Sequence, residues 1–162
     1  MVVPFFRPAI SLLLALTAGC SFASDPATRL RDAEELTRQG NYDQAIESYQ
    51  AHMESRIAAT DRPEWENPHF YLLLIGDVEL GRGDTGKALT FYEEAEQKGV
   101  ATPLISDRYR AVASWHEEHG QLKEAMELLS KYRDRDDLLF DSMLDRIAKE
   151  LTRKESEEVV AH

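Results

Sequence analysis

Apolar residues in the central part of the chain recur three or four positions apart, the spacing of one face of an α-helix. Gly40 separates a first segment with a narrow apolar stripe from a second segment with a broader one. The order of helix, glycine and helix returns around Gly83 and Gly120, and these three glycines lie 43 and 37 residues apart. The pattern therefore predicts three helix-turn-helix units.

Proline marks the start of each unit. Pro26, Pro68 and Pro103 each follow a polar residue that suits a helix start, and proline at the first helical position loses no hydrogen bond. The second unit opens on six consecutive apolar residues, 70–75. A helix that is apolar all round is a buried one, so we expect the second unit in the middle of a stack.

A last amphipathic segment follows the third unit. Its apolar face is formed by Phe140, Leu144, Ile147 and Leu151. Solenoids use a single helix of this kind to cover their exposed end. Residues 26–153 are therefore predicted to form one all-α domain, a short antiparallel helix-turn-helix solenoid with a C-terminal capping helix, and the charged residues 154–162 are predicted to fray.

The residues at each turn resemble the tetratricopeptide repeat (TPR). That family has a glycine that ends the first helix, a small residue where the two helices cross and an aromatic residue one turn later. A larger residue at the crossing would push the two helices apart. The matching repeat positions are Gly40, Ala45 and Tyr49 in the first copy, Gly76, Gly83, Ala88 and Tyr92 in the second, and Ala113, Gly120 and Ala125 in the third.

The resemblance implies that a partner binds a concave groove lined by the first helix of each copy. The matching groove positions are Leu30, Glu34 and Thr37, then Leu73, Asp77 and Leu80, and finally Arg110, Ser114 and Glu117. Such a face is mixed apolar and acidic. It lacks the paired lysine and asparagine with which co-chaperone members hold a C-terminal carboxylate, so binding of chaperone tails is not expected.

The first residues are typical of a targeting segment rather than of part of the fold. Arg7 precedes an apolar run, 9–18, that suits a secretory signal peptide and is shorter than the ~20 residues needed to span a bilayer. The run ends in Leu-Thr-Ala-Gly-Cys at 16–20, which resembles the lipobox of bacterial lipoproteins. The resemblance implies that residues 1–19 are a signal peptide, that Cys20 carries the lipid anchor, palmitate included, and that 20–25 are a short lipidated tether.

Two other outcomes stay open for this segment. Ser21-Phe22-Ala23 has small residues where an ordinary signal peptidase needs them, which would give a soluble secreted protein, and an uncut segment would remain as a membrane tail. A buried structural thiol is not expected, because Cys20 abuts the apolar run and is the only cysteine. By resemblance to Gram-negative lipoproteins, serine rather than aspartate after the cysteine favours the outer membrane, with the domain in the periplasm.

Charge narrows the range of partners. The chain has 43% hydrophobic and 30% charged residues, enough for one modest core, and a net charge of −11. Removing residues 1–19 takes one of the 19 basic residues, which leaves 18 basic and 30 acidic residues and a net charge of −12. Nucleic acid and anionic lipid headgroups repel such a domain. No nucleic-acid partner is therefore expected.

The sequence offers little catalytic chemistry. His116 and His119 lie three residues apart, whereas zinc proteases place two histidines four apart and add a third ligand. In the repeat they fall at a packing position and at a helix end, so we predict no metal site, no cofactor and no enzymatic activity. Arg82-Gly83-Asp84 spells an adhesion tripeptide, but its glycine and aspartate already have roles in the turn.

Trp65 lies in an insertion, residues 56–66, that lengthens the first interval between units. Two interpretations are open. Tryptophan is a frequent anchor of protein interfaces, so Trp65 would be a docking residue if it is exposed. Alternatively, the side chain folds back and covers the gap between two repeats.

These features predict a non-catalytic scaffold, a lipid-anchored adaptor at the bacterial cell envelope that binds a protein or peptide and helps to assemble or regulate a membrane-associated complex. The alternative is a soluble periplasmic or secreted repeat module that forms homo-oligomers through its convex faces or the Trp65 insertion. A small metal-dependent hydrolase built on His116 and His119 is a third hypothesis.

Overall fold

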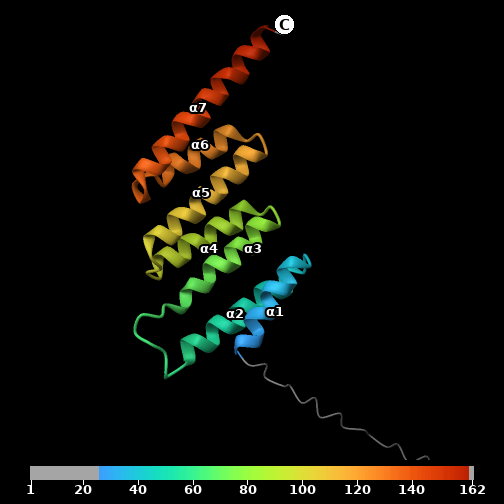
Figure 1. Cartoon of the computed structure of the whole chain (residues 1–162), viewed down its shortest axis with the longest axis vertical. Helices are drawn as coiled ribbons and strands as arrows, with labels where there is room; N and C mark the ends of the chain where they lie inside the picture. Colours follow the sequence, from blue (N-terminus) through green and yellow to red (C-terminus); the bar gives the residue numbers. More distant parts are fainter. Residues whose placement is uncertain (1–25, 161–162) are drawn as a thin grey trace, which may run out of the picture.

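The computed structural model describes residues 26–160, with side chains from 28 to 157, and these residues form helices and their connections without a strand. The helices are α1 (Pro26–Arg38), α2 (Tyr42–Ala58), α3 (Tyr71–Gly81), α4 (Thr85–Gln97), α5 (Thr102–Glu118), α6 (Leu122–Lys131) and α7 (Asp137–Val160), with 3-10 turns at Pro68–Phe70 and Arg133–Arg135. Consecutive helices pack against one another, and α3 also contacts α5. The predicted all-α fold is confirmed: antiparallel helix pairs are stacked in chain order and α7 follows them (Figure 1).

Two kinds of connection lie on opposite edges of the stack. The short turns inside the pairs, at Gly40, Gly83 and Gly120, lie on the right in Figure 1 and form what we call the turn edge. The longer connections lie on the left and form the connection edge. They comprise residues 59–67, 98–101 and 132–136.

Glycine ends the first helix of every pair in a left-handed backbone conformation. The φ angles are 76° at Gly40, 89° at Gly83 and 74° at Gly120, values that only glycine adopts readily. The next N–H then bonds back into the helix, as in the 2.9 Å bond from the N–H of Asn41 to the carbonyl oxygen of Leu36. The predicted turns are confirmed.

Small residues stand where the helices of each pair cross. Ala45, Ala88 and Ala125 are fully buried, as predicted for the crossing positions. In the second pair, Gly76 lies directly under the ring of Tyr92, and a Cβ atom at Gly76 would lie 2.3 Å from a ring carbon. The close approach of α3 and α4 therefore depends on the missing side chain.

The core has two parts, which meet at α3. A small cluster joins α1, α2 and one side of α3, and its buried members are Ala33, Ala45, Tyr49, Ile75 and Val78. The main cluster runs from the other side of α3 to α7, where Phe140 and Ile147 are fully buried. The apolar α3 is thus covered on both sides, which confirms its predicted place in the middle of the stack.

The ends of two helices differ from the prediction. The helix expected to begin at Pro68 starts with a 3-10 turn capped by the side chain of Asn67, and α3 proper begins at Tyr71. At the other end, α7 continues to Val160, so residues 154–160 are helical rather than frayed. Arg153 forms ion pairs with Glu150 and Glu157, one turn away on either side, and such pairs extend a helix beyond its packed part.

None of the described helices is long and apolar enough to cross a bilayer. Cys20, the predicted signal peptide and the whole of the tether lie outside the described residues, as do residues 161 and 162. The lipid anchor therefore stays a prediction.

Candidate functional site

Three of the predicted groove residues gather around the side chain of Tyr49. Glu34 and Thr37 come from α1 and Asp77 comes from α3. Burial raises the pKa of the Tyr49 hydroxyl, and the negative charges of Glu34 and Asp77 raise it further. Glu34 is exposed, and Thr37 and Asp77 are half-buried. These side chains therefore lie near one another on the stack.

Asp77 connects this face to the next pair. One of its carboxylate oxygens accepts a 2.9 Å hydrogen bond from the hydroxyl of Tyr92, and the other accepts one of 2.9 Å from the guanidinium of Arg108 on α5. A second guanidinium nitrogen lies 3.3 Å from the first oxygen, so Arg108 binds the carboxylate at two points. We call Glu34, Thr37, Asp77 and Arg108 the polar row, since they run across α1, α3 and α5.

The prediction for Leu73 is wrong, because its side chain is fully buried in the main core. A middle helix is contacted by neighbours on both sides, so the position that faces solvent in a terminal repeat is covered here. Leu30 and Leu80 are half-buried and pack against the two core clusters, with only part of each side chain at the surface.

The third copy contributes less to this face than predicted. Arg110 is exposed and pairs with Asp107 on its own helix at 3.1 Å. Glu117 is held by Arg146 of α7, with a hydrogen bond of 2.8 Å to one carboxylate oxygen. It lines a hollow of about 650 Å³ between α5 and α7 whose other walls are largely charged. Ser114 is half-buried and is the remaining candidate from α5.

Trp65 is 84% exposed, so the interpretation in which it covers the gap between repeats is wrong. The connection that carries it is fixed directly after Trp65. The guanidinium of Arg56 donates hydrogen bonds of 2.7 and 2.5 Å to Glu66, and the side-chain amide of Asn67 donates one of 3.1 Å to the carbonyl oxygen of Lys98. Trp65 borders a mostly apolar hollow of about 410 Å³, together with Phe70, Tyr71, Val100, Ala101 and Leu104.

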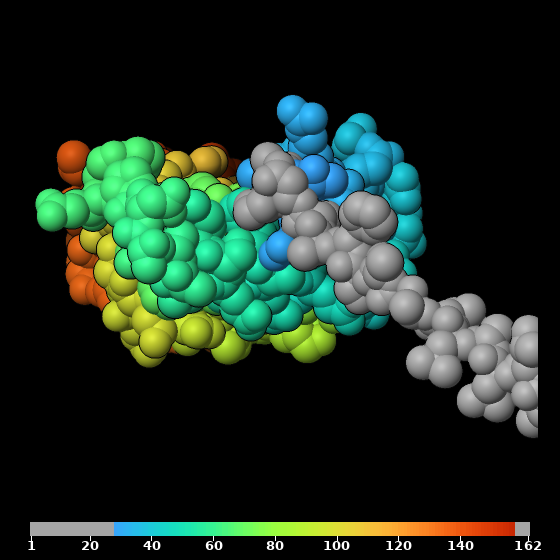
Figure 2. Space-filling model, turned by 90° about the horizontal axis from the view of Figure 1, so that it is seen from below, coloured from blue at the N-terminus to red at the C-terminus, as the bar shows by residue number. Residues whose placement is uncertain are grey.

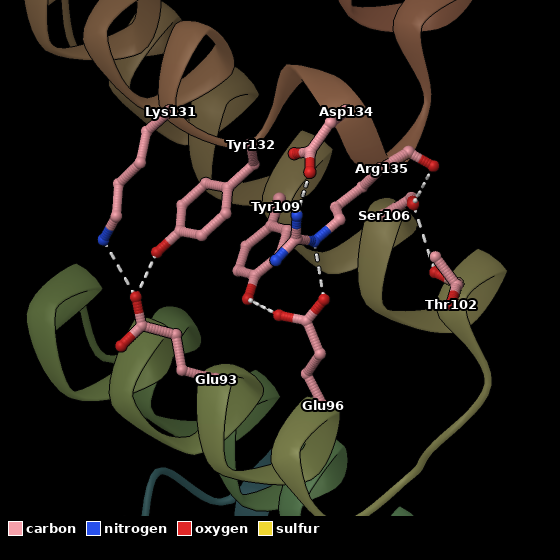
Figure 3. A network of polar contacts seen from close by, with 9 residues as sticks. All are labelled: Glu93, Glu96, Thr102, Ser106, Tyr109, Lys131, Tyr132, Asp134 and Arg135. Atoms are coloured by element: carbon pink, nitrogen blue, oxygen red, sulfur yellow. Dashed lines mark hydrogen bonds and ion pairs between the residues drawn. The ribbon is translucent and has the colours of Figure 1, made fainter.

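A network of tyrosines and acids joins α4 to the following elements (Figure 3). Glu93 accepts hydrogen bonds from the hydroxyl of Tyr132 and from Lys131, and these bonds lower the pKa of its carboxyl group. Glu96 accepts from the hydroxyl of Tyr109 at 3.1 Å and from Arg135 at 2.6 Å. The rings of Tyr109 and Tyr132 are stacked with centroids 3.6 Å apart. We call this network the clamp, because it joins α4 of the second helix pair to the third pair and to the connection that follows it.

The two histidines considered as metal ligands have local partners. Nδ1 of His116 lies 2.6 Å from the side-chain oxygen of Gln121, and Nδ1 of His119 lies 2.7 Å from the carbonyl oxygen of Trp115. The ring of His119 also stacks on that of Trp115, with centroids 3.7 Å apart. Within residues 26–160 no group of three potential metal-binding side chains comes together.

The adhesion-like tripeptide is used inside the fold. Arg82 forms an ion pair of 2.7 Å with Asp43 of α2 and lies 2.6 Å from an oxygen of the buried Glu79, at an angle outside hydrogen-bond geometry. The side chain of Asp84 caps α4 by accepting a 3.0 Å bond from the N–H of Lys87. The tripeptide therefore serves the turn and the contact between the first two pairs.

Sequence reasoning missed Arg108 as a member of the polar row. The repeat register points to positions that lie ten, six and three residues before the turn glycine, and Arg108 lies twelve before Gly120. Side chains on a helix lean towards its N-terminus, and arginine is long enough to reach the neighbouring α3. A basic residue two positions before the first groove residue of α5 was the signal that could have identified it.

No protein-family model matches the sequence, and no curated protein matches it. The geometry itself offers a face with exposed and half-exposed carboxylates, flanked by partly exposed leucines. Such a face can hold a positively charged or mixed segment of another chain.

Proposed function

We propose that this protein is a non-catalytic docking scaffold of the TPR type, held at the bacterial cell envelope by a lipid on Cys20. Its partner is a protein or peptide segment that lies across α1, α3 and α5. The scaffold faces the periplasm from the outer membrane and helps to assemble or regulate a membrane-associated complex.

The polar row is the observation that supports this proposal most directly. Asp77 draws partners from α4 and α5, and its charge also reaches Tyr49 of α2. These bonds fix α3 relative to α5, so this part of the face is preorganised before a partner arrives. A preorganised face whose described residues include neither a nucleophile nor a metal cluster suits recognition of a partner.

The chemistry of the face indicates the chemistry of the partner. Glu34 is exposed, the carboxylate of Asp77 is 39% exposed, and Leu30 and Leu80 present part of their side chains nearby in the register. A segment with basic residues between apolar ones would complement these groups. The net charge of −11 would also draw a basic partner by long-range attraction.

Site-specific photo-crosslinking in intact envelopes tests the docking face. A photo-reactive residue at position 34 or 114 should give one discrete adduct, because both positions lie on the proposed face. Positions 94 and 127 serve as controls, since Glu94 and Glu127 are exposed on the second helices α4 and α6. Adducts of equal yield at all four positions, or none at 34 and 114, would contradict the proposal.

Membrane fractionation tests the anchor. Cys20→Ser should move the full chain from the detergent phase to the soluble fraction, because the thiol that carries the acyl chains is lost. Ser24→Ala is the matched control and should leave the protein in the membrane fraction. Unchanged partitioning of Cys20→Ser would remove the lipid anchor from the proposal while leaving the crosslinking result interpretable.

A further inference from the structure

Four large apolar side chains are exposed in the described part of the chain. Trp65 and Leu138 are 84% and 83% exposed, and Ile57 and Leu104 are 45% and 36% exposed. A single exposed apolar residue is ordinary in a folded protein. Four such residues indicate a functional surface only if they lie on the same side of the molecule.

All four lie on the connection edge. Ile57 is near the end of α2, Trp65 is in the 59–67 connection, and Leu104 and Leu138 are in the first turns of α5 and α7. Figure 1 shows these places one above another on the left of the stack. In Figure 2 the green 59–67 connection stands out on the same side, with yellow and orange segments behind it. The turn edge has no exposed large apolar side chain among the described residues.

The charges on the connection edge are balanced, unlike those of the whole chain. The stretches 56–67, 97–104 and 131–138 contain six basic residues, Arg56, Arg62, Lys98, Lys131, Arg133 and Arg135, and six acidic ones, Asp61, Glu64, Glu66, Asp134, Asp136 and Asp137. The chain as a whole has a net charge of −11, so the acidic excess lies elsewhere. Headgroups that repel the helix faces would therefore not repel this edge.

Side-chain bonds of the connection hold Trp65 in its exposed position. The bidentate pair between Arg56 and Glu66 and the bond from Asn67 to Lys98 fix the two residues that follow Trp65. Below Trp65, the hollow of about 410 Å³ adds further apolar surface that opens at the same edge. Tryptophan is the side chain most enriched at the level of lipid headgroups, because its ring is amphipathic.

The tether reaches this edge. Because α1 runs antiparallel to α2, its N-terminus points towards the connection edge, and Arg29 contacts the carbonyl oxygen of Ala51. Ala51 lies seven residues before the end of α2 and Arg29 lies three residues after the start of α1, so α1 begins roughly 6 Å short of that end at 1.5 Å per residue. The five residues between Cys20 and Pro26 can span up to about 18 Å. A lipid on Cys20 can thus lie in the plane of the edge.

We propose that the connection edge is the face this domain lays on the bilayer, with Trp65 and Leu138 entering the headgroup region. The inference rests on the membrane anchoring proposed above and adds an orientation to it. In this orientation the acidic faces and the polar row stand beside the membrane rather than against it. A partner can then bind the polar row while the domain stays on the lipid surface.

The two tryptophans of the chain allow a matched test, because Trp115 lies at the turn edge beside Gly83. Two full-length proteins each keep one reporter: Trp115→Phe reports on Trp65, and Trp65→Phe reports on Trp115. Each is attached at residue 20 to phosphatidylcholine vesicles, through its own lipid or, where the thiol is free, through a maleimide-bearing phospholipid. Emission is compared between vesicles with brominated and with ordinary acyl chains.

Brominated lipid should lower the emission of Trp65 by about twofold and leave that of Trp115 nearly unchanged, because only the former reaches the interface. Leu138→Glu in the Trp115→Phe protein should reduce the quenching of Trp65, since the edge then carries an added charge. Equal quenching of the two reporters, no quenching of Trp65, or quenching that Leu138→Glu does not alter would overturn the proposal. So would a Trp65 that responds to a protein partner and never to brominated lipid.

This test stands apart from the proposed function. Chemical attachment at residue 20 places the domain on the vesicle whether or not the cell lipidates Cys20, so failure of the anchor appears only in membrane fractionation. Failure of the docking face appears only in crosslinking at positions 34 and 114. If only the quenching experiment fails, the proposed orientation of the connection edge on the bilayer is wrong, while the lipid anchor and the docking face are unaffected.

Discussion

At the scale of single residues, the packing of α3 against α4 depends on the absence of a Cβ atom at Gly76. Gly76 has the ring of Tyr92 where its Cβ would be, and the hydroxyl of that ring donates to Asp77 in the polar row. Burial raises the pKa of the Tyr92 hydroxyl far above its ordinary range, so the hydroxyl stays a donor at any physiological pH. The glycine thus sets both the helix crossing and the geometry of the polar row.

Gly76→Ala should lower the free energy of unfolding by roughly 1–3 kcal/mol, because an added methyl group would overlap a ring that has no room to move. Gly81→Ala is the control in the same helix, where a Cβ would meet no other atom within 4 Å. It should stabilise the protein by about 0.5–1 kcal/mol through the reduced entropy of the unfolded chain. Urea denaturation compares the two, and equal effects would contradict this account of the crossing.

The clamp at Glu93 predicts a dependence of stability on pH. Hydrogen bonds from Tyr132 and Lys131 hold the pKa of Glu93 below its unfolded value of about 4.3. Its contribution is therefore complete above that pH and is lost as the pH falls through the folded pKa. The urea midpoint should drop between neutral and acidic pH, and Glu93→Gln should show a smaller drop. Glu94→Gln, at an exposed position of the same helix, is the control. An identical drop in wild type and Glu93→Gln would count against the clamp.

At the scale of elements, the connections differ in what they do. The turn edge is made of short glycine turns, whereas the 59–67 connection is longer, is fixed by side chains and presents Trp65. Arg56 and Glu66 are the residues that decide its shape, and hydrogen bonding to Arg56 lowers the pKa of the Glu66 carboxyl. The connection is therefore an ordered surface feature.

Glu66→Gln should release this connection without unfolding the stack, because it removes the charge that the guanidinium of Arg56 binds. Amide hydrogen exchange of residues 57–66 should accelerate about tenfold. Exchange in α4 and α5 should not change. Glu64→Gln, on the exposed side of the same connection, is the control. Equal exchange rates in both variants would show that the pair does not hold the connection.

Sequence patterns predicted the elements far better than the contacts between them. Gly40 and Ala88 are set by their own turn or crossing, so local spacing identifies them. Leu73 and Arg108 depend on the neighbouring pairs that cover or approach them, and no local pattern carries that information. Trp65 depends on an ion pair between residues ten positions apart, across a loop of irregular backbone. The helix stack was therefore predictable, whereas the docking face was predictable only in part.

At the scale of the whole molecule, α7 closes the stack and then continues beyond it (Figure 1). Phe140 and Ile147 are fully buried against the last pair, while residues 152–157 are exposed. The first half of the helix thus belongs to the core and the second half is held by its own ion pairs.

Two truncations separate these halves. A chain that ends at Arg153 should keep its stability within about 0.5 kcal/mol, because the described side chains that it loses, 154–157, are exposed. A chain that ends at Asp136 should lose cooperative unfolding and bind a hydrophobic dye, because the α6 side of the main core is then uncovered. Thermal unfolding followed by circular dichroism measures both. A cooperative transition in the shorter chain would contradict the role of α7 as the cap of the stack.

The central claim is that this stack is a docking scaffold whose recognition face includes the polar row. The most direct test is the affinity of the full-length protein for the segment recovered by crosslinking at position 34. Glu34→Arg, at an exposed position, should weaken binding about tenfold, or ~1.4 kcal/mol, by reversing a charge on the face. Glu94→Arg makes the same change on α4 and should leave the affinity unaltered. Equal affinities for wild type, Glu34→Arg and Glu94→Arg would contradict the claim.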